Sequence, residues 1–264
     1  MPKREFESRN LLLFLLITFA WSWGFWLPEI LWDTSMFVAP FGPMVGAVAL
    51  TYMNRGSGGV KALLKRGTDL KFGKIWLLPI LFLIPAIYAL SLFLAMHLDG
   101  FVPDLVALSQ PIIIPFAFVY ILILGGPLAE EFGWRGYALD RFQVRYSALG
   151  SSIILGVIWG LWHLPLFYMP SQQDFYSNIP FLGFFVGAIF LSVLFTWIYN
   201  NTGRSMLAVL LFHTTSNLAV FLFPAMESEF RGLYSTVISF LVVVVIVFVY
   251  GARSLRKRPA RISR

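Results

Sequence analysis

The sequence predicts an all-α polytopic membrane protein with about eight transmembrane helices. Of its 264 residues, 58% are apolar and only 12% are charged, whereas soluble domains carry about 25% charged residues. Several apolar runs reach the ~20 residues that a spanning helix needs. None shows the alternation over about ten residues that is typical of a transmembrane β-strand, and only helices and closed barrels satisfy the backbone in lipid.

The apolar segments follow one another along the whole chain. The first begins after a basic start and continues without a small-residue cleavage site, so it is interpreted as a retained span and not as a signal peptide. No composition shift marks a second domain, and residues 1–264 are expected to form a single integral membrane domain. The expected helices are, in order, residues 11–32, 36–53, 75–96, 111–139, 150–169, 179–199, 204–223 and 232–251.

Basic residues predict the orientation, because they concentrate in the cytoplasmic loops of membrane proteins. With the N-terminus inside, every Lys and Arg except Arg231 falls in the terminal segments or in an inner connection, and the connection 54–74 is the richest. A miscounted span would scramble this separation, so both termini are predicted to be cytoplasmic, in a multi-pass protein of the plasma (inner) membrane. The outer connections carry the acids Asp33, Asp99, Asp104, Asp174, Glu227 and Glu229.

Three of the expected helices contain ionisable residues, which are costly inside a membrane. The fourth helix carries Glu130 and Glu131, the fifth His163 and the seventh His213. Counted from the expected inner helix ends at ~1.5 Å per residue, Glu130 and both histidines lie at a similar depth of about 14–16 Å. We therefore expect one buried site that opens toward the cytoplasm.

Helical spacing adds further residues to these positions. Glu131 and Arg135 are four residues apart in the order that favours an ion pair, and Asn217 shares a helix face with His213. Gly156 and Gly160 have the GxxxG spacing that allows close helix packing.

These residue types suit the hydrolysis of an amide. A carboxyl group buried in a membrane has a raised pKa, and beside a histidine it can take a proton from water. A second histidine and an amide can stabilise the oxyanion that follows. Two histidines and a glutamate, here Glu130, His163 and His213, equally match a catalytic zinc with an open position. The residue types alone do not separate these two mechanisms.

Other protease designs are excluded by the sequence. It contains no cysteine, no HExxH pattern and no GxSxG elbow, which removes the cysteine nucleophile, the helical zinc-protease pattern and the serine elbow. Residues 127–217, the expected functional core, instead carry three short motifs in order. They are Glu130-Glu131-xxx-Arg135, Trp159-xxx-His163 and His213-xxx-Asn217.

The order and spacing of these motifs resemble the CPBP family, the CAAX-protease and bacteriocin-processing (Abi) group of intramembrane proteases. The FGP sequence at 41–43 is also similar to an element found upstream in bacterial members. The resemblance implies that Glu130 activates water with the help of His163, and that His213 and Asn217 bind the oxyanion. It also implies an integral membrane enzyme whose partners are the lipid bilayer and a membrane-associated peptide or protein, and not nucleic acid.

The resemblance implies supporting roles for the remaining motif residues. Glu131 and Arg135 would orient the site, and Trp159 stands where the family usually has phenylalanine. Two other functions stay open. A proton-coupled transporter would also use buried Glu and His, although it favours related halves and the polar cluster here lies wholly in the second half. A catalytically idle membrane scaffold could retain the same motifs.

Overall fold

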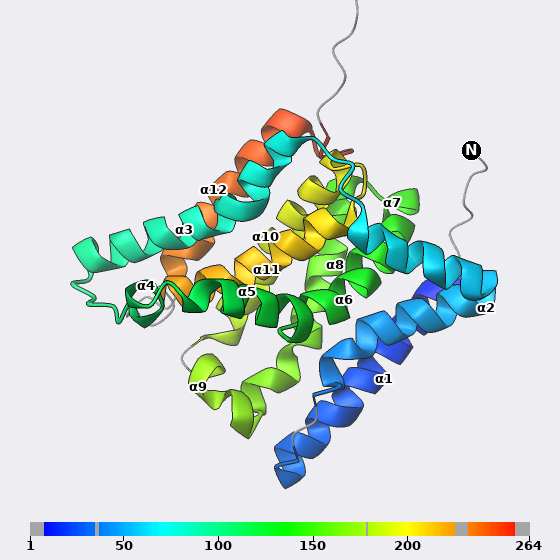
Figure 1. Ribbon diagram of the computed structural model, residues 1–264, viewed down its shortest axis with the longest axis horizontal. Coiled ribbons are helices and arrows are strands. Elements are labelled where there is room, and N and C mark those ends of the chain that lie inside the picture. Colours follow the sequence, from blue (N-terminus) through cyan, green and yellow to red (C-terminus); the bar gives the residue numbers. More distant parts are fainter. Residues whose placement is uncertain (1–7, 35–36, 178, 225–231, 257–264) are drawn as a thin grey trace, which may run out of the picture.

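The computed structural model describes residues 8–34, 37–177, 179–224 and 232–256, and all regular structure in these ranges is helical (Figure 1). The predicted class, an all-α polytopic membrane protein, is confirmed. The longer helices are α1 (Ser8–Trp32), α2 (Gly42–Lys65), α3 (Leu77–Leu98), α5 (Ile113–Leu124), α6 (Pro127–Gly133), α7 (Asp140–Arg145), α8 (Ala148–Trp162), α10 (Phe181–Asn201), α11 (Met206–Leu222) and α12 (Leu233–Tyr250).

Shorter elements connect these helices. The α-helical turns are α4 (Val106–Ser109) and α9 (Gln173–Tyr176), and a π-helix covers Trp134–Leu139 between α6 and α7. The 3-10 turns are Ala39–Phe41, Arg66–Thr68, Lys74–Trp76, Leu164–Tyr168 and Pro170–Gln172.

A helix occurs at each of the eight predicted segments, but not all of them have the length and hydropathy of a span. Within the described ranges, five helical stretches pass this test, or six if the bent pair 113–124 and 127–145 is one span. The helix α11 has only 17 residues. The helix α2 continues past its predicted end into the basic connection and bends at Gly56. Eight spans and cytoplasmic termini therefore stay predictions.

The fourth predicted helix is not continuous, and the expectation of one uninterrupted helix over 111–139 is wrong. Its two halves bend by 42° at Gly125 and Gly126, directly before the acidic pair. Gly126 has a φ of +109°, a conformation that only glycine adopts easily. Pro127 then begins α6 at the first helical position, where its missing N–H is not needed. The sequence Gly-Gly-Pro thus ends one helix and starts the next.

The connections gather at two ends of the bundle, as the charges predicted. Asp140 lies 3.3 Å from Arg204 and 3.8 Å from Arg66, which joins three connections predicted to be inner. At the opposite end, the Tyr234 hydroxyl donates to Asp99 over 2.6 Å. We call these the basic end and the acidic end. Glu227, Glu229 and Arg231 lie outside the described residues. The acidic end carries, among the described residues, Glu29, Asp33, Asp99, Asp104 and Asp174.

Glycines bring the helices around the centre into close contact. A Cβ on Gly156 would lie 2.7 Å from the Cα of Ile189, and one on Gly160 would lie 2.8 Å from the Phe185 ring, so the GxxxG pair packs α8 against α10. The FGP element also brings two helices into close contact. Gly133 of α6 rests directly on the backbone of Pro43, which leaves no room for a side chain. The element therefore fixes α2 against the helix that carries the acids.

Candidate active site

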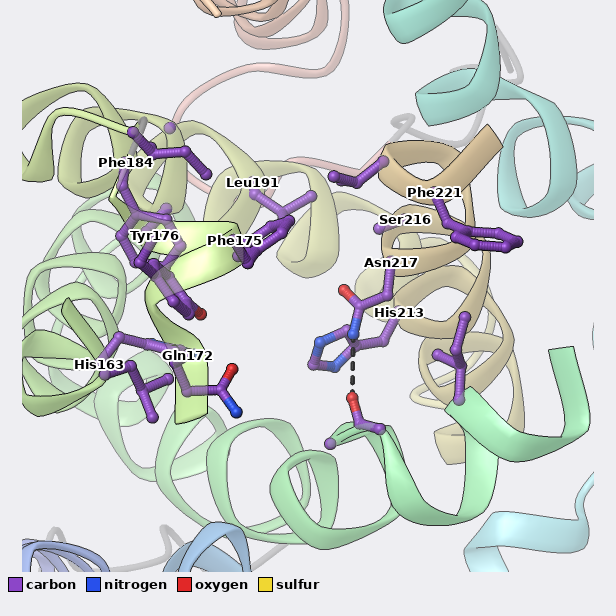
Figure 2. A pocket seen from close by; sticks show the side chains of 18 of the residues that line it. His163, Gln172, Phe175, Tyr176, Phe184, Leu191, His213, Ser216, Asn217 and Phe221 are labelled. Atoms are coloured by element: carbon purple, nitrogen blue, oxygen red, sulfur yellow. Dashed lines mark hydrogen bonds between the residues drawn. The ribbon is translucent and has the colours of Figure 1, made fainter. Parts of the chain in front are cut away.

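A cavity of about 1090 Å³ lies among α1, α3, α5, α8, α10 and α11 and brings most of the predicted site residues together. In Figure 2, His163 lies on one side of this space and His213 and Asn217 lie on the other. Two of the predicted residues, Glu131 and Arg135, lie behind the cavity wall and are both 0% exposed. The cavity is lined by five of the predicted residues: Glu130, Trp159, His163, His213 and Asn217.

Glu130 lies in the first turn of α6 and is 5% exposed. The missing side chain of Gly126 makes room for its carboxylate, because a Cβ there would lie 2.6 Å from Oε1. The indole Nε1 of Trp159 donates to Oε2 over 2.7 Å. Oε2 is therefore fixed by a donor from α8, and the glycine at the break between α5 and α6 leaves space for Oε1.

Trp159 also contacts both histidines. Its ring centroid lies 5.2 Å from that of His163 and 5.8 Å from that of His213, with edge-to-face geometry in each case. A phenylalanine at this position could make the ring contacts but not the hydrogen bond to Glu130. Trp159 thus contacts Glu130, His163 and His213, the three ionisable motif residues that line the cavity.

His163 caps the C-terminal end of α8, where the helix tightens into the 3-10 turn Leu164–Tyr168. Its Nδ1 lies 2.7 Å from the carbonyl oxygen of Trp159. Because a carbonyl only accepts, Nδ1 carries the proton, and Nε2 is the acceptor when the ring is neutral. His163 therefore presents a basic nitrogen away from its own helix.

Glu131 lies behind the cavity wall and contacts two side chains, Arg135 and His213. Its Oε1 accepts from Arg135 over 2.7 Å and lies 2.8 Å from Nδ1 of His213. This confirms the predicted ion pair and adds a contact between α6 and α11. Arg135 stacks over the ring of Phe195, 3.8 Å from its centroid. Arg135 belongs to the π-helix Trp134–Leu139 and is fully buried.

Asn217 lies one turn after His213 and donates from Nδ2 to the carbonyl oxygen of Gly125 over 3.1 Å, the dashed line in Figure 2. This bond uses one of the two amide hydrogens of the side chain. It also ties α11 to the break between α5 and α6, so that the amide and Glu130 are positioned by the same turn.

The predicted zinc ligands do not form a ligand set in this structure. Among the described residues, no three His, Cys, Asp or Glu side chains come close enough to share a metal ion. Glu130 is held by Trp159, and His213 uses Nδ1 for Glu131. The choice between proton transfer by the side chains themselves and a catalytic zinc therefore stays a prediction.

The cavity opens in the direction opposite to the one predicted. Its lining extends from Glu130 to Glu29, Asp104 and Asp174, which belong to the acidic end. The expected opening toward the basic, cytoplasmic end is therefore wrong for this bundle. The sequence allowed an estimate of the distance from the site to the inner helix ends. It could not show at which end packed side chains block access to the site.

Two residues that sequence reasoning missed also line the cavity. Glu29 is a buried acid in the apolar stretch FWLPEILW, and an acid in such a run was a usable signal. Tyr176 comes from α9, where no pattern indicated a site. Burial raises the pKa of Tyr176 above its usual range, and the carboxylate of Glu130 adds to this rise, so its hydroxyl stays a donor.

Comparison with known proteins was consistent with the motifs. Residues 110–219 match the family described as Type II CAAX prenyl endopeptidase Rce1-like. The chain is also similar to a CAAX prenyl protease 2 from Methanococcus maripaludis, with 30% identity over 164 residues. That alignment covers 60% of this chain and 60% of the length of the archaeal protein. The matched segment contains all seven residues that the sequence assigned to the site.

Proposed function

We propose, on the premise that residues 110–219 carry the core of the CAAX-protease (CPBP) family, that this chain is an intramembrane endopeptidase. It would hydrolyse a peptide bond of a membrane-associated protein or peptide. The observation that carries the proposal is the buried cavity in which Trp159 fixes the carboxylate of Glu130 while His163 and His213 contact the same indole.

Glu130 is the base in this proposal. Its Oε2 accepts from Trp159, so Oε1 takes the proton of a water molecule as the water oxygen attacks the carbonyl carbon of the substrate. His163 presents Nε2 as an acceptor to the same water, because its Nδ1 is bound to the Trp159 carbonyl. The proton then passes to the leaving nitrogen as the C–N bond breaks, which yields an acid and an amine without a covalent enzyme intermediate.

The oxyanion is stabilised from the opposite wall. Asn217 keeps one amide hydrogen after its bond to Gly125 and can donate it to the oxyanion. His213 can donate from Nε2 only if its ring carries both protons, because Nδ1 already faces Glu131. Glu131 supports that imidazolium with its negative charge. Arg135 shares the same carboxylate oxygen and holds it in place.

The surroundings of the cavity favour a substrate that comes from the membrane. Its wall contains many aromatic and aliphatic side chains, among them Tyr120, Leu124, Phe184 and Phe221. Such a wall excludes bulk water from the carboxylate and accepts an apolar polypeptide segment. We propose the plasma membrane as the location. No observation favours transport, since the residues of the basic end do not line the cavity.

The test is the cleavage of a membrane-peptide library by the purified protein in lipid nanodiscs. Glu130→Gln and His163→Ala should each lower kcat by about 10²–10⁴-fold, the usual contribution of a positioned base. His97→Ala is the matched control, because His97 is exposed and lies away from the cavity. Cleavage should persist after stringent chelation. Equal activity of both variants and the wild type would remove the endopeptidase proposal.

A further inference from the structure

Glu29 is a buried acid that the proposed mechanism does not use. It lies near the C-terminal end of α1, is 3% exposed and lines the cavity. The hydroxyl of Ser171 donates to its Oε1. Acids within membrane helices are costly and generally face a partner charge or a substrate path. One neutral hydroxyl group replaces only part of the hydration that a carboxylate loses on burial.

The lining of the cavity is strongly one-sided in charge. Although the chain carries a net charge of +7, no Lys or Arg of the described residues lines this cavity. Within the described ranges, no Lys or Arg forms an ion pair with Glu29. The ionisable acids in the lining are Glu29, Asp104, Glu130 and Asp174.

Aromatic rings connect Glu29 with the reacting end of the cavity. Trp26 precedes Glu29 by one helical turn, and its ring centroid lies 4.7 Å from that of Trp162. The Trp162 ring lies in turn 4.8 Å from that of His163. Rings of this kind attract cations through their faces. Glu29 and Trp26 thus form a polar and aromatic corner on the wall that also carries His163.

We propose that Glu29 is a specificity subsite for a cationic group of the peptide, the side chain of a lysine or arginine or a free N-terminal amine. The proposal rests on the endopeptidase function, whose substrate class it names. The cation would pair with the Glu29 carboxylate, which has no Lys or Arg partner among the described residues. The substrate is then an apolar, membrane-associated peptide that carries a positive charge near the scissile bond.

The geometry also limits where that charge lies in the substrate. An extended peptide advances ~3.4 Å per residue. Two ring contacts and one helical turn separate His163 from Glu29, so the charged residue lies about three to five residues from the scissile bond.

A competing interpretation is that Glu29 only fastens the segment 170–176 through Ser171. The two interpretations differ in the effect of Ser171→Ala, which removes the hydroxyl group and keeps the carboxylate. If Glu29 only holds this segment in place, Ser171→Ala and Glu29→Gln should have the same effect on peptide binding. A cation subsite needs only Glu29.

The experiment is peptide binding to the Glu130→Gln protein in nanodiscs, which prevents turnover. A series of fluorescent peptides carries one lysine at each successive position, and each has a twin with norleucine instead. At one position the lysine peptide should bind about 10- to 100-fold more tightly than its twin. Adding Glu29→Gln should abolish this preference, whereas adding Ser171→Ala should retain it. Asp33→Asn, which removes an exposed acid of the same end outside the cavity, is the matched control.

The proposal is overturned if lysine and norleucine bind equally at every position, if Glu29→Gln keeps the preference, or if Ser171→Ala loses it to the same extent. The first of these outcomes needs no Glu29 variant, so the test stands even if that variant does not fold. Binding without any cleavage by the wild type would contradict the endopeptidase function and leave the cation subsite supported. Cleavage by the wild type without a lysine preference would support the endopeptidase function and contradict the cation subsite.

Discussion

Trp159 is the residue at which this chain departs from the CPBP motif pattern that it resembles, and the departure has a chemical consequence. The indole N–H supplies the hydrogen bond to Glu130 that phenylalanine cannot make. A donor to a carboxylate favours its ionised form and restricts its rotation. The same side chain separates the rings of His163 and His213. We therefore regard Trp159 as a positioning residue for the proposed base.

Trp159→Phe should keep the packing of the cavity and remove this donor. We expect kcat to fall by about 10- to 100-fold, because a lost hydrogen bond to a charged group corresponds to roughly 1.5–3 kcal/mol. Trp134→Phe is the control, because the Trp134 indole N–H has no hydrogen-bond partner among the described residues. An unchanged kcat in Trp159→Phe would contradict the positioning role.

Glu131 allows structural and catalytic effects to be separated. Glu131→Gln leaves the buried guanidinium of Arg135 without its counter-ion, which should cost about 3–5 kcal/mol of unfolding free energy. In the double variant Glu131→Gln/Arg135→Met neither charge remains, so much of that stability should return. Activity should not return, because His213 still lacks the carboxylate at Nδ1. Thermal unfolding and kcat on the same samples test this. Recovery of both quantities together would assign Glu131 a structural role only.

At the scale of the elements, the break between α5 and α6 decides how the acids are presented. A continuous helix would have left Glu130 without the free space beside Gly126. It would also have left the Gly125 carbonyl within helical hydrogen bonding, out of reach of Asn217. Arg135 belongs to the π-helix that follows and is fully buried. Irregular helical turns of this kind are frequent at functional sites.

Gly126→Ala tests this break directly. The variant must adopt a φ near +109° and would bring its Cβ to 2.6 Å from Oε1 of Glu130. We expect a loss of stability of roughly 1–3 kcal/mol from the strained backbone and a fall in kcat beyond tenfold. Gly24→Ala is the control, because nothing lies within 4 Å of a Cβ there. Normal cleavage by Gly126→Ala would show that the carboxylate does not need this space.

At the scale of the whole molecule, the two ends of the bundle give the cavity a direction. The basic connections contact one another around Asp140, and the cavity opens at the other end. With the orientation that the basic residues predict, the mouth of the cavity faces away from the cytoplasm. The proposed substrate would then enter from the outer side or from the lipid at that depth.

Single introduced cysteines can measure this orientation, because the chain has none of its own. In intact cells, a membrane-impermeant thiol reagent should label Asp174→Cys, at the mouth of the cavity, and should label Lys61→Cys only after the cells are opened. Both positions are exposed, so differences in burial do not decide the result. The reversed labelling pattern would show the opposite orientation in the membrane, with the mouth of the cavity on the cytoplasmic side.

The sequence by itself determined the helical class, the candidate residues of the cavity, the ion pair of Glu131 with Arg135 and the glycine packing of α8. Each of these follows from local patterns, because helical hydrogen bonds and the spacing of side chains on one face involve residues three or four positions apart. Gly-Gly-Pro was also a local signal for a break, but the apolar run around it favoured one continuous helix.

Only the tertiary structure decided which of these residues meet and where the cavity opens. The bonds of Trp159 to Glu130 and of His213 to Glu131 join residues 29 and 82 positions apart. The subsite at Glu29 joins α1 to a segment 142 positions later. Such contacts depend on how helices pack, and packing is set by the combined fit of many side chains that no single segment encodes. The sequence could therefore name the candidate catalytic groups, but only the packed bundle showed their partners and the end at which the cavity opens.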